Sequence, residues 1–433
     1  MITSRAWAGR RYAVLGLARS GAAAVRALAS AGARVTAWDG DEERRAPFLD
    51  ATADGVEIAD LDATDLSRFH ALVVSPGVPI NTHPLAAKAR AGSVPIIGDI
   101  ELFAEARGEL PAHRVVGITG TNGKSTTTAL VHHILTSGGV PSLMGGNIGL
   151  PILTQDPLPA GGVYVLELSS YQIDITRSLD CEVAVLLNVT PDHLDRYDGF
   201  DAYAASKARL FAMQSPWHEA IVGIGTDASY RIGRSLSGRG ERLTKIAPGV
   251  CMDQSRWPAL QGPHNAQNAL AAIAAARALG VAERDIDRGL ESFEGLPHRM
   301  RRVGTRNGVV FVDDSKATNP EAAAPALGAF DRVHWILGGR AKGGGLDACR
   351  PFFDRVARAY AIGEAGPRFA ELLRAEGTAV EDSGTLDRAV EAAAAAARAG
   401  DVVLLSPAAA SFDQFRDYEE RGNRFRDLVG ELA

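Results

Sequence analysis

A glycine-rich segment near residue 120 has the residue types of a phosphate-binding loop. It runs from Gly117 to Ser125, between an apolar stretch and a segment rich in threonine. Glycines let several backbone N–H groups face one anion, Lys124 adds a cation for the outer phosphates, and the Ser125 hydroxyl can reach a magnesium ion. The general P-loop spacing would place its first glycine at Ile118, so the match is imperfect. Taken alone, the segment favours nucleotide binding over a structural strand-to-helix turn.

Two further groups of polar side chains follow predicted strands downstream of this loop. Glu167 lies at the end of an apolar run, where P-loop folds need a magnesium-binding carboxylate, although a capping acid would look the same. The loop after the next apolar run carries His193 between two acids, followed by Arg196. Loops after parallel strands are where α/β proteins place their sites, although a lone histidine is usually structural. Downstream of a P-loop, the metal-binding interpretation of Glu167 is favoured, whereas the His193 loop is a candidate site of undefined role.

The N-terminal region resembles half of a dinucleotide-binding fingerprint. Gly16 and Gly21 flank a turn between a predicted strand and helix, and Asp39 ends the following strand. The middle glycine of the GxGxxG pattern is missing, so a nicotinamide cofactor is poorly supported. The turn can still hold a pyrophosphate at the helix N-terminus, with a uridine or ribose hydroxyl near Asp39.

The elements that must position these residues follow one pattern three times along the chain. Each time, a short β-rich apolar run leads through a glycine-containing turn into an alanine-rich helical stretch, which is typical of parallel α/β units. We therefore expect an α/β protein with three domains. Residues 1–110 would form a Rossmann-like UDP-binding domain, 111–302 a central P-loop domain with a mostly parallel sheet, and 303–433 a second Rossmann-like domain.

Composition narrows the class of protein. The 433 residues are 46% hydrophobic and 23% charged, which is ordinary for a folded protein of several domains. The net charge of -6 gives no attraction for nucleic acid or an anionic membrane, and no stretch has the roughly 18 uninterrupted apolar residues of a membrane helix. The three widely spaced cysteines fit no disulfide framework. These features predict a cytoplasmic protein that neither binds nucleic acid nor inserts into membranes.

Six short motifs occur together over the whole chain, at residues 120–125, 146–149, 167–170, 188–193, 262–265 and 296–299. Their combination resembles the Mur ligases of peptidoglycan synthesis. Within that family, residues 314–319, 337–339 with Lys342, and 405–415 resemble the members that add D-glutamate. The resemblance implies ATP-dependent ligation of D-glutamate to UDP-N-acetylmuramoyl-L-alanine through an acyl phosphate, giving ADP and phosphate, by an enzyme expected to be a monomer.

The resemblance also implies roles for individual residues. The catalytic residues would be Lys124, Glu167, His193 and Lys207. Two magnesium ions would be held by Ser125, Glu167, His193 and Lys207, with Lys207 carbamylated so that it offers carboxylate-like oxygens. Without the family match, a solvated helix lysine would be the better interpretation of Lys207.

The remaining site residues follow in the same way. ATP would contact Gly120, Thr121, Asn122, Gly123, Lys124, Ser125, Thr126, Asn265, Asn268, Arg299 and Asp314. The UDP-sugar would contact Gly16, Leu17, Ala18, Arg19, Ser20, Asp39, Ser75, Pro76, Gly77 and Asn147. Glutamate would contact Lys316, Thr318, Lys342, Ser411 and Tyr418. Two residues depart from the family pattern, because Ala409 replaces a frequent cysteine and Tyr418 a frequent phenylalanine.

Three other functions stay open from the sequence. The same ligase chemistry could use L-glutamate or another amino acid as acceptor, because residue spacing does not report the handedness of an amino acid. A non-catalytic nucleotide-sensing P-loop protein would keep the loop but need not keep Glu167, His193 and Lys207. A nicotinamide oxidoreductase would rest on the N-terminal region and predicts tight NAD(P) binding without ATP turnover.

Overall fold

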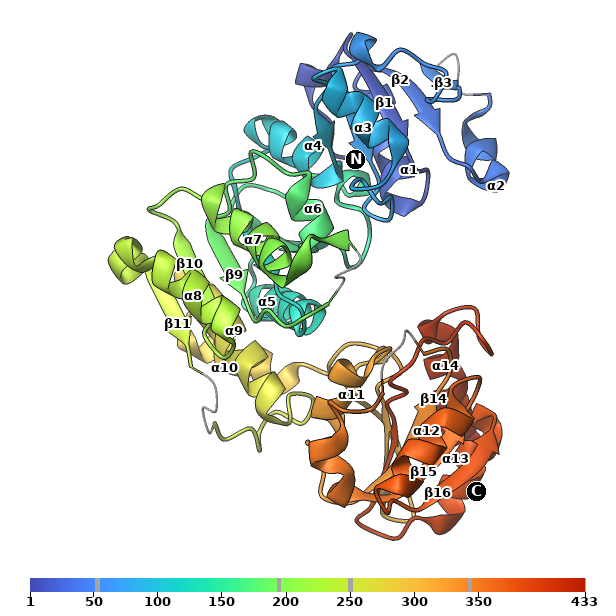
Figure 1. The fold of residues 1–433 in the computed structure, drawn as a ribbon. Coiled ribbons are helices and arrows are strands. Elements are labelled where there is room, and N and C mark those ends of the chain that lie inside the picture. The colour runs from blue at the N-terminus through green and yellow to red at the C-terminus, as the bar shows by residue number, and fades with distance from the viewer. Residues whose placement is uncertain (51–54, 193–195, 248–251, 342–344, 433) are drawn as a thin grey trace. The chain divides into compact units, whose positions relative to one another are not determined.

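Three sheets organise the part of the chain that this computed structural model describes, namely residues 1–50, 55–192, 196–247, 252–341 and 345–432 (Figure 1). The chain divides into two compact units. The first comprises Met1–Pro248 with Leu270–Gly289, and the second comprises Gly249–Ala269 with Leu290–Ala433. Two sheets belong to the first unit and one to the second. The α/β class with three sheet-based domains, predicted from the sequence, is confirmed.

The N-terminal sheet has the strand order β3-β2-β1-β4-β5, with parallel pairing throughout. Its central strand β1 is buried from Tyr12 to Leu15, because helices cover both faces of a parallel sheet and leave no exposed side. The strands are β1 (Arg11–Leu15), β2 (Arg34–Trp38), β3 (Val56–Ile58), β4 (Ala71–Val74) and β5 (Ile96–Ile97). The helices are α1 (Arg19–Ser30), α2 (Glu42–Arg45), α3 (Pro84–Ala91) and α4 (Asp99–Ala106).

The central sheet has the order β11-β10-β9-β6-β8-β7 and is also parallel. Its strands are β6 (His113–Thr119), β7 (Ser142–Gly146), β8 (Gly162–Glu167), β9 (Val183–Leu186), β10 (Glu219–Gly223) and β11 (Leu243–Ile246). The helices are α5 (Lys124–Ser137), α6 (Ser170–Asp174), α7 (Gly199–Ala212), α8 (Asp227–Ser235), α9 (Pro263–Ala278) and α10 (Glu283–Ser292). Helices α9 and α10 each cross from one unit to the other.

The third sheet has the order β12-β13-β17-β14-β15-β16, in which β12 and β13 are antiparallel and the other pairs are parallel. Its strands are β12 (Arg301–Arg306), β13 (Val309–Asp313), β14 (Val333–Gly338), β15 (Val356–Ile362), β16 (Val380–Gly384) and β17 (Val402–Leu405). Its helices are α11 (Pro320–Leu327), α12 (Gly366–Ala375), α13 (Leu386–Ala396) and α14 (Tyr418–Glu431). Apolar clusters lie on both faces of this sheet.

The register of the central sheet determines which loops meet. Strand β6 lies between β8 and β9, with Ile118 opposite Glu167 and Thr119 opposite Leu186. The glycine-rich loop after β6, the carboxylate that ends β8 and the loop after β9 therefore leave the sheet at the same carboxyl edge. This is the edge where open α/β sheets bind ligands.

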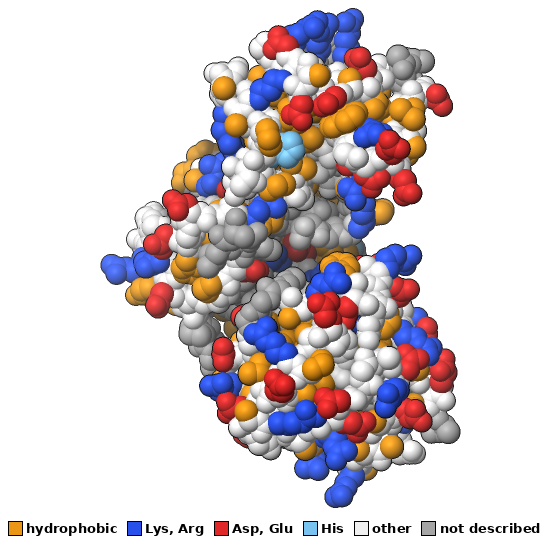
Figure 2. Space-filling model, turned by 45° about the vertical axis from the view of Figure 1, so that its right-hand side comes forward, with side chains coloured by type: hydrophobic (Ala, Val, Ile, Leu, Met, Phe, Trp, Pro, Cys, Tyr) orange, Lys and Arg blue, Asp and Glu red, His pale blue; other side chains and the backbone are white. Residues whose placement is uncertain are grey.

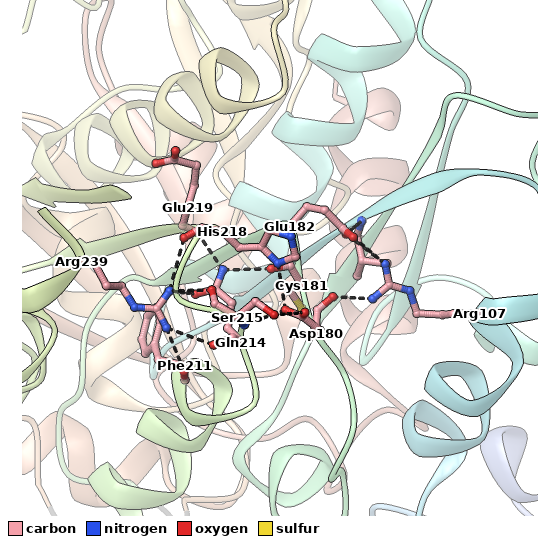
Figure 3. Close-up of polar contacts among 11 residues, drawn as sticks. Arg107, Asp180, Cys181, Glu182, Phe211, Gln214, Ser215, His218, Glu219 and Arg239 are labelled. Carbon is pink, nitrogen blue, oxygen red and sulfur yellow. Dashed lines mark hydrogen bonds and ion pairs between the residues drawn. The ribbon is translucent and has the colours of Figure 1, made fainter. Parts of the chain in front are cut away.

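A polar network closes the opposite, amino-terminal edge of the central sheet (Figure 3). Arg107 donates from Nη2 to Glu182 Oε1 and Oε2 at 2.8 and 3.0 Å, and from Nη1 to the Asp180 carbonyl. Asp180 also accepts hydrogen bonds from the Ser215 hydroxyl and contacts His218 Nδ1 at 2.9 Å. The network therefore connects the segments that precede β9 and β10 to Arg107.

Charged side chains of both signs are interspersed over the face drawn in Figure 2. This distribution agrees with the small negative net charge of -6. Among the helices of the described residues, none has the length and apolar character needed to cross a membrane.

Candidate active site

The glycine-rich loop joins β6 to α5 in the geometry of an anion cradle. Gly123 precedes the helix with φ 86°, a left-handed conformation that glycine adopts without strain, and no side chain caps the helix there. The loop therefore lies at the positive end of a 14-residue helix, where a bound anion is favoured. Lys124 folds back over the loop and donates to the carbonyls of Gly120 and Thr121 at 3.0 and 2.8 Å. Ser125 is buried in the first turn, and Thr126 is half-buried.

Asn188, in the loop after β9, holds the glycine-rich loop in place. Its side chain accepts from the Asn122 N–H at 2.9 Å and donates to the Asn122 carbonyl at 3.1 Å. Its own carbonyl accepts from the Thr121 N–H at 3.0 Å. The Thr121 hydroxyl also donates to the Thr190 carbonyl at 3.1 Å. Sequence reasoning gave Asn188 no role, although its place in the 188–193 motif marked it for attention.

Glu167 presents one unused carboxylate oxygen at the end of β8. Its Oε1 accepts from Asn147 Nδ2 at 3.1 Å, whereas Oε2 is buried and has no hydrogen-bond partner within the described residues. A buried carboxylate oxygen without a partner is costly, and a hard cation would remove that cost. Gly146 allows the backbone of β7 to pass close to Glu167, because a Cβ at position 146 would lie 2.1 Å from the Glu167 carbonyl oxygen. Glu167 thus fits a magnesium ligand.

The rest of the expected metal set is described only in part. His193 lies outside the described residues. Within the described ranges, no group of three or more His, Cys, Asp or Glu side chains has the arrangement of a metal site. The expected set contains only two side chains of these types, Glu167 and His193, and otherwise uses Ser125 and Lys207.

Lys207 is buried on α7, with a relative exposure of 1%. Its Nζ donates to the Gly120 carbonyl at 2.9 Å and lies 4.6 Å from the centre of the Tyr203 ring. Burial, followed by the nearby charge of Lys124, lowers the pKa of Lys207 well below its usual value, although nearby acids oppose this. The interpretation as a solvated helix lysine is wrong, because the side chain is buried and its amine donates to the Gly120 carbonyl in the glycine-rich loop. A neutral amine is also the form that reacts as a nucleophile.

The N-terminal turn between β1 and α1 is held by two buried side chains. The Ser75 hydroxyl, just after β4, donates to the Gly16 carbonyl at 2.8 Å. Asp39, just after β2, accepts from the Leu17 N–H at 2.6 Å and from the Asp41 N–H at 3.0 Å. Burial alone would raise the pKa of Asp39, but these hydrogen bonds and Arg44 lower it overall. Asp39 therefore supports the turn directly, a role that sequence reasoning did not assign to it.

The same turn leaves a helix start available to an anion. No side chain caps α1, whose N-cap residue is Ala18, so the positive end of the helix can interact with an anion there. Gly21 must be glycine, because a Cβ there would lie 1.8 Å from the Gly16 carbonyl. Arg19 donates to the Gly149 carbonyl at 2.6 Å and so ties α1 to the loop after β7 that carries Asn147. The residues expected to bind the UDP-sugar are thus brought together within the first unit.

Four residues expected to contact ATP lie in the second unit, namely Asn265, Asn268, Arg299 and Asp314. Asn268 Nδ2 donates to Asn265 Oδ1 at 3.1 Å on adjacent turns of α9, and both side chains are buried. Burial raises the pKa of Asp314 to about 7, although Asp314 accepts from the Ser406 hydroxyl at 2.7 Å. Burial therefore favours the protonated form of this carboxyl more than it would at an exposed site.

Of the residues expected to bind glutamate, Lys316 and Tyr418 meet at the start of α14. Lys316 Nζ lies 3.6 Å from the centre of the Tyr418 ring, and the Thr318 N–H donates to the Lys316 carbonyl at 2.8 Å. Ser411 is buried after β17, and Lys342 lies outside the described residues.

Arg421 supports these loops, and sequence reasoning missed it. It is 1% exposed and donates to the Ser315 carbonyl at 2.8 Å and to the Ala409 carbonyl at 3.1 Å. It shares the buried face of α14 with Phe425 and Val429, at spacings of one and two helical turns. A charged residue in line with an apolar helix stripe was the available signal.

Comparison with known proteins gives matches along the whole chain. A model of the Mur ligase MurD-like N-terminal domain matches residues 10–98, one of the Mur ligase middle domain matches 118–248, and one of the Mur ligase glutamate ligase domain matches 298–409. The UDP-N-acetylmuramoylalanine–D-glutamate ligase of Novosphingobium aromaticivorans is 60% identical over 100% of this chain and 97% of its own length. The ligase of the same name from Caulobacter vibrioides is 45% identical over 100% of this chain and 98% of its own length.

Solved structures share the fold at much lower identity. The UDP-N-acetylmuramate-alanine ligase of Thermotoga maritima aligns with a TM-score of 0.60 at 17% identity, covering 98% of this chain and 99% of that one. A UDP-N-acetylmuramoylalanyl-D-glutamyl-2,6-diaminopimelate–D-alanyl-D-alanyl ligase from Acinetobacter baumannii aligns with a TM-score of 0.60 at 19% identity, covering 92% and 90%. Full-length relatives, three domain matches and a glycine-rich loop beside a buried carboxylate and a buried lysine lead to one conclusion: the chain belongs to the Mur ligase family.

Proposed function

We propose that the protein is an ATP-dependent ligase that joins D-glutamate to UDP-N-acetylmuramoyl-L-alanine, a step of peptidoglycan precursor synthesis. The observation that carries the proposal is the meeting of three groups at one sheet edge. These are the uncapped glycine-rich loop, the unused oxygen of Glu167 and the buried amine of Lys207. The names of the full-length relatives support the choice of substrates.

Amide formation from a carboxylate needs a leaving group, which ATP supplies. The alanine carboxylate oxygen attacks the γ-phosphorus, the bond to the bridging oxygen breaks, and ADP leaves. The D-glutamate amine then attacks the acyl carbon, loses a proton, and expels phosphate through a tetrahedral intermediate. Lys124 and the N–H groups of the loop would offset the charge that gathers on the transferring oxygens.

The magnesium site is proposed from the donor set. Glu167 Oε2, the Ser125 hydroxyl, His193 and Lys207 would hold two ions. Magnesium, when bound, neutralises charge on the phosphate oxygens. Asn147 orients Glu167 through its hydrogen bond of 3.1 Å, which leaves Oε2 as the free ligand atom.

Carbamylation of Lys207 is part of the proposal. A neutral amine adds to the carbon of CO2, forms an N–C bond and loses a proton, which replaces a cation by a carboxylate-like anion. Burial and the lowered pKa of Lys207 favour this reaction, because the uncharged amine is its nucleophile. Recovery of activity in Lys207→Ala on addition of a short carboxylate such as acetate would support it, and no recovery across a series of short acids would oppose it.

The other substrates are assigned by domain. Residues 1–110 would bind the UDP-sugar, 111–302 would bind ATP and 303–433 would bind glutamate through Lys316, Thr318, Lys342, Ser411 and Tyr418. The scarcity of cysteine and the use of ATP support a cytoplasmic location.

The deciding experiment measures phosphate release from ATP in the presence of UDP-N-acetylmuramoyl-L-alanine, with D-glutamate, L-glutamate or no amino acid. We expect release that depends on D-glutamate. Release with L-glutamate alone would retain the ligase chemistry and overturn the acceptor. The absence of release with either would overturn the proposal and favour a nucleotide-sensing protein.

A further inference from the structure

Arg196 joins the loop after β9 to the N-terminal turn that follows β4. Its Nη2 donates to the Val78 carbonyl at 3.0 Å and lies 3.5 Å from the Pro76 carbonyl, while Nη1 lies 3.5 Å from the Gly77 carbonyl. The carbonyl of Arg196 in turn accepts from Asn81 Nδ2 at 3.1 Å. Both the side chain and the main chain of Arg196 therefore form hydrogen bonds with residues 76–81.

The Arg196 guanidinium also stacks on an aromatic ring. The Arg196 guanidinium carbon lies 4.1 Å from the centre of the Tyr171 ring. Tyr171 in turn stacks on Tyr197, with ring centres 6.0 Å apart and planes 10° from parallel. A planar guanidinium can stack on a ring while its edge donates hydrogen bonds, which a lysine ammonium cannot do.

The aromatic contacts continue to the phosphate loop. The Tyr197 hydroxyl donates to Asp174 at 2.8 Å, and its ring meets Tyr203 edge-on at 5.3 Å. The Tyr203 hydroxyl lies 3.2 Å from the Thr121 hydroxyl in the glycine-rich loop. A continuous series of contacts thus runs from the turn at Pro76 to the loop proposed to bind ATP.

The space beside this series is not filled by packed side chains. A cavity of about 550 Å³ lies here, lined from the N-terminal side by residues such as Ser75 and Ile80 and from the central side by Tyr171, Asp174 and Ala205. Continuous apolar packing, which would otherwise fix the position of the turn, is interrupted at this place. The hydrogen bonds of Arg196 therefore contribute more to fixing the position of the turn.

We propose that Arg196 is a positioning residue, which fixes the turn at Pro76, Gly77 and Val78 relative to the phosphate loop. The inference rests on the proposed function, in which this turn contacts the UDP-sugar. The carboxylate at the end of that substrate must reach the γ-phosphate, and small errors of placement reduce both binding and rate. No atom of Arg196 needs to touch a reacting group for this role.

The test compares four single variants in the full-length protein with one double variant, which combines Arg196→Gln and Tyr171→Leu. Arg196→Gln removes the bridge, Arg196→Lys keeps the charge without the planar stack, and Tyr171→Leu removes the ring. Arg90→Gln is the matched control, since Arg90 lines the same cavity but donates to the Ile80 carbonyl, within the N-terminal side, at 3.0 Å. Calorimetry gives the Kd of UDP-N-acetylmuramoyl-L-alanine and of a non-hydrolysable ATP analogue, and thermal unfolding reports stability.

For Arg196→Gln we expect a Kd for the UDP-substrate weakened about tenfold, as for lost charge-assisted hydrogen bonds, with the Kd for the ATP analogue within about twofold. The Kd of Arg196→Lys for the UDP-substrate should lie between those of the wild type and Arg196→Gln. The Kd of Arg90→Gln should equal that of the wild type. Because Tyr171 acts through Arg196, the double variant should be no weaker than Arg196→Gln alone.

Three results would overturn the inference. These are an unchanged Kd for the UDP-substrate in Arg196→Gln, equal weakening of both ligands with a lowered melting temperature, or additive losses in the double variant. Turnover of the wild type with D-glutamate tests the proposed function separately. Binding of the UDP-substrate reads the role of Arg196 even in a protein that accepts a different amino acid.

Discussion

Replacing Lys207 by methionine should change how stability depends on pH. The lysine is 1% exposed, so the folded protein disfavours its charged form and holds its pKa below the unfolded value of about 10.4. Methionine has a similar length and no charge to bury. The Gly120 carbonyl, which accepts from Lys207, keeps a second donor in Lys124 at 3.0 Å. The substitution therefore removes a titrating group without leaving that acceptor unpaired.

The sign and size follow from proton linkage. Between the lowered folded pKa and about 10.4, the unfolded chain binds a proton at Lys207 that the folded chain does not. The free energy of unfolding of the wild type therefore rises with pH in this window, by about 1.4 kcal/mol per pH unit from this residue. Lys207→Met lacks this contribution. Its free energy of unfolding relative to the wild type should therefore fall as pH rises toward about 10.4, with a slope of up to about 1.4 kcal/mol per pH unit.

Urea denaturation followed by circular dichroism measures this difference, in buffers free of CO2 so that the amine stays unmodified. Lys245→Met is the matched control, because it makes the same substitution at a lysine that lies exposed on the edge strand β11. A stability difference for Lys207→Met that stays constant from pH 8 to 9.5 would refute the argument that the folded protein holds a neutral lysine.

Three further outcomes follow from the site. Glu167→Gln should lower D-glutamate-dependent phosphate release by about 100-fold at saturating magnesium, because Oε2 would no longer be an anionic ligand; near-normal release would contradict the metal role. Asn188→Ala should raise the KM for ATP about tenfold, since its bonds at 2.9 and 3.1 Å hold the phosphate loop; an equal rise for the UDP-substrate would count against this reason. Arg421→Met should destabilise the second unit by about 3 kcal/mol in thermal unfolding, because buried carbonyls of Ser315 and Ala409 lose their donor; a loss below about 1 kcal/mol would show that another group replaces it.

Much of the element order followed from local pattern. The apolar run at 12–15 became β1, and the glycine-rich segment became a loop between β6 and α5. Helix α9 begins at Pro263, within the 262–265 motif. Proline at the first helical position needs no N–H partner, so it starts a helix as readily as it ends one.

Individual roles were harder to predict when they depended on distant partners. The sequence suggested a ligand hydroxyl near Asp39, which stays a prediction, and the structure adds that its carboxylate accepts from the Leu17 and Asp41 N–H groups. In the sequence, Arg196 is one of several charged residues in a polar loop. The structure shows that it donates a hydrogen bond to the Val78 carbonyl. The contacts of Asp39 with Leu17 and of Arg196 with Val78 have no periodic signature, because each joins segments that are far apart in the chain.

The sequence by itself determined the α/β class, the phosphate loop and the motifs that carry the family resemblance, since these depend on neighbouring residues and on glycine conformation. Only the tertiary structure decided that Glu167 ends with one unpaired oxygen, that Lys207 is buried and that Asn188 holds the loop. The reason is the strand order β9-β6-β8, which places three separate loops at one edge. Burial and hydrogen-bond partners there are set by packing between elements, which local pattern does not contain.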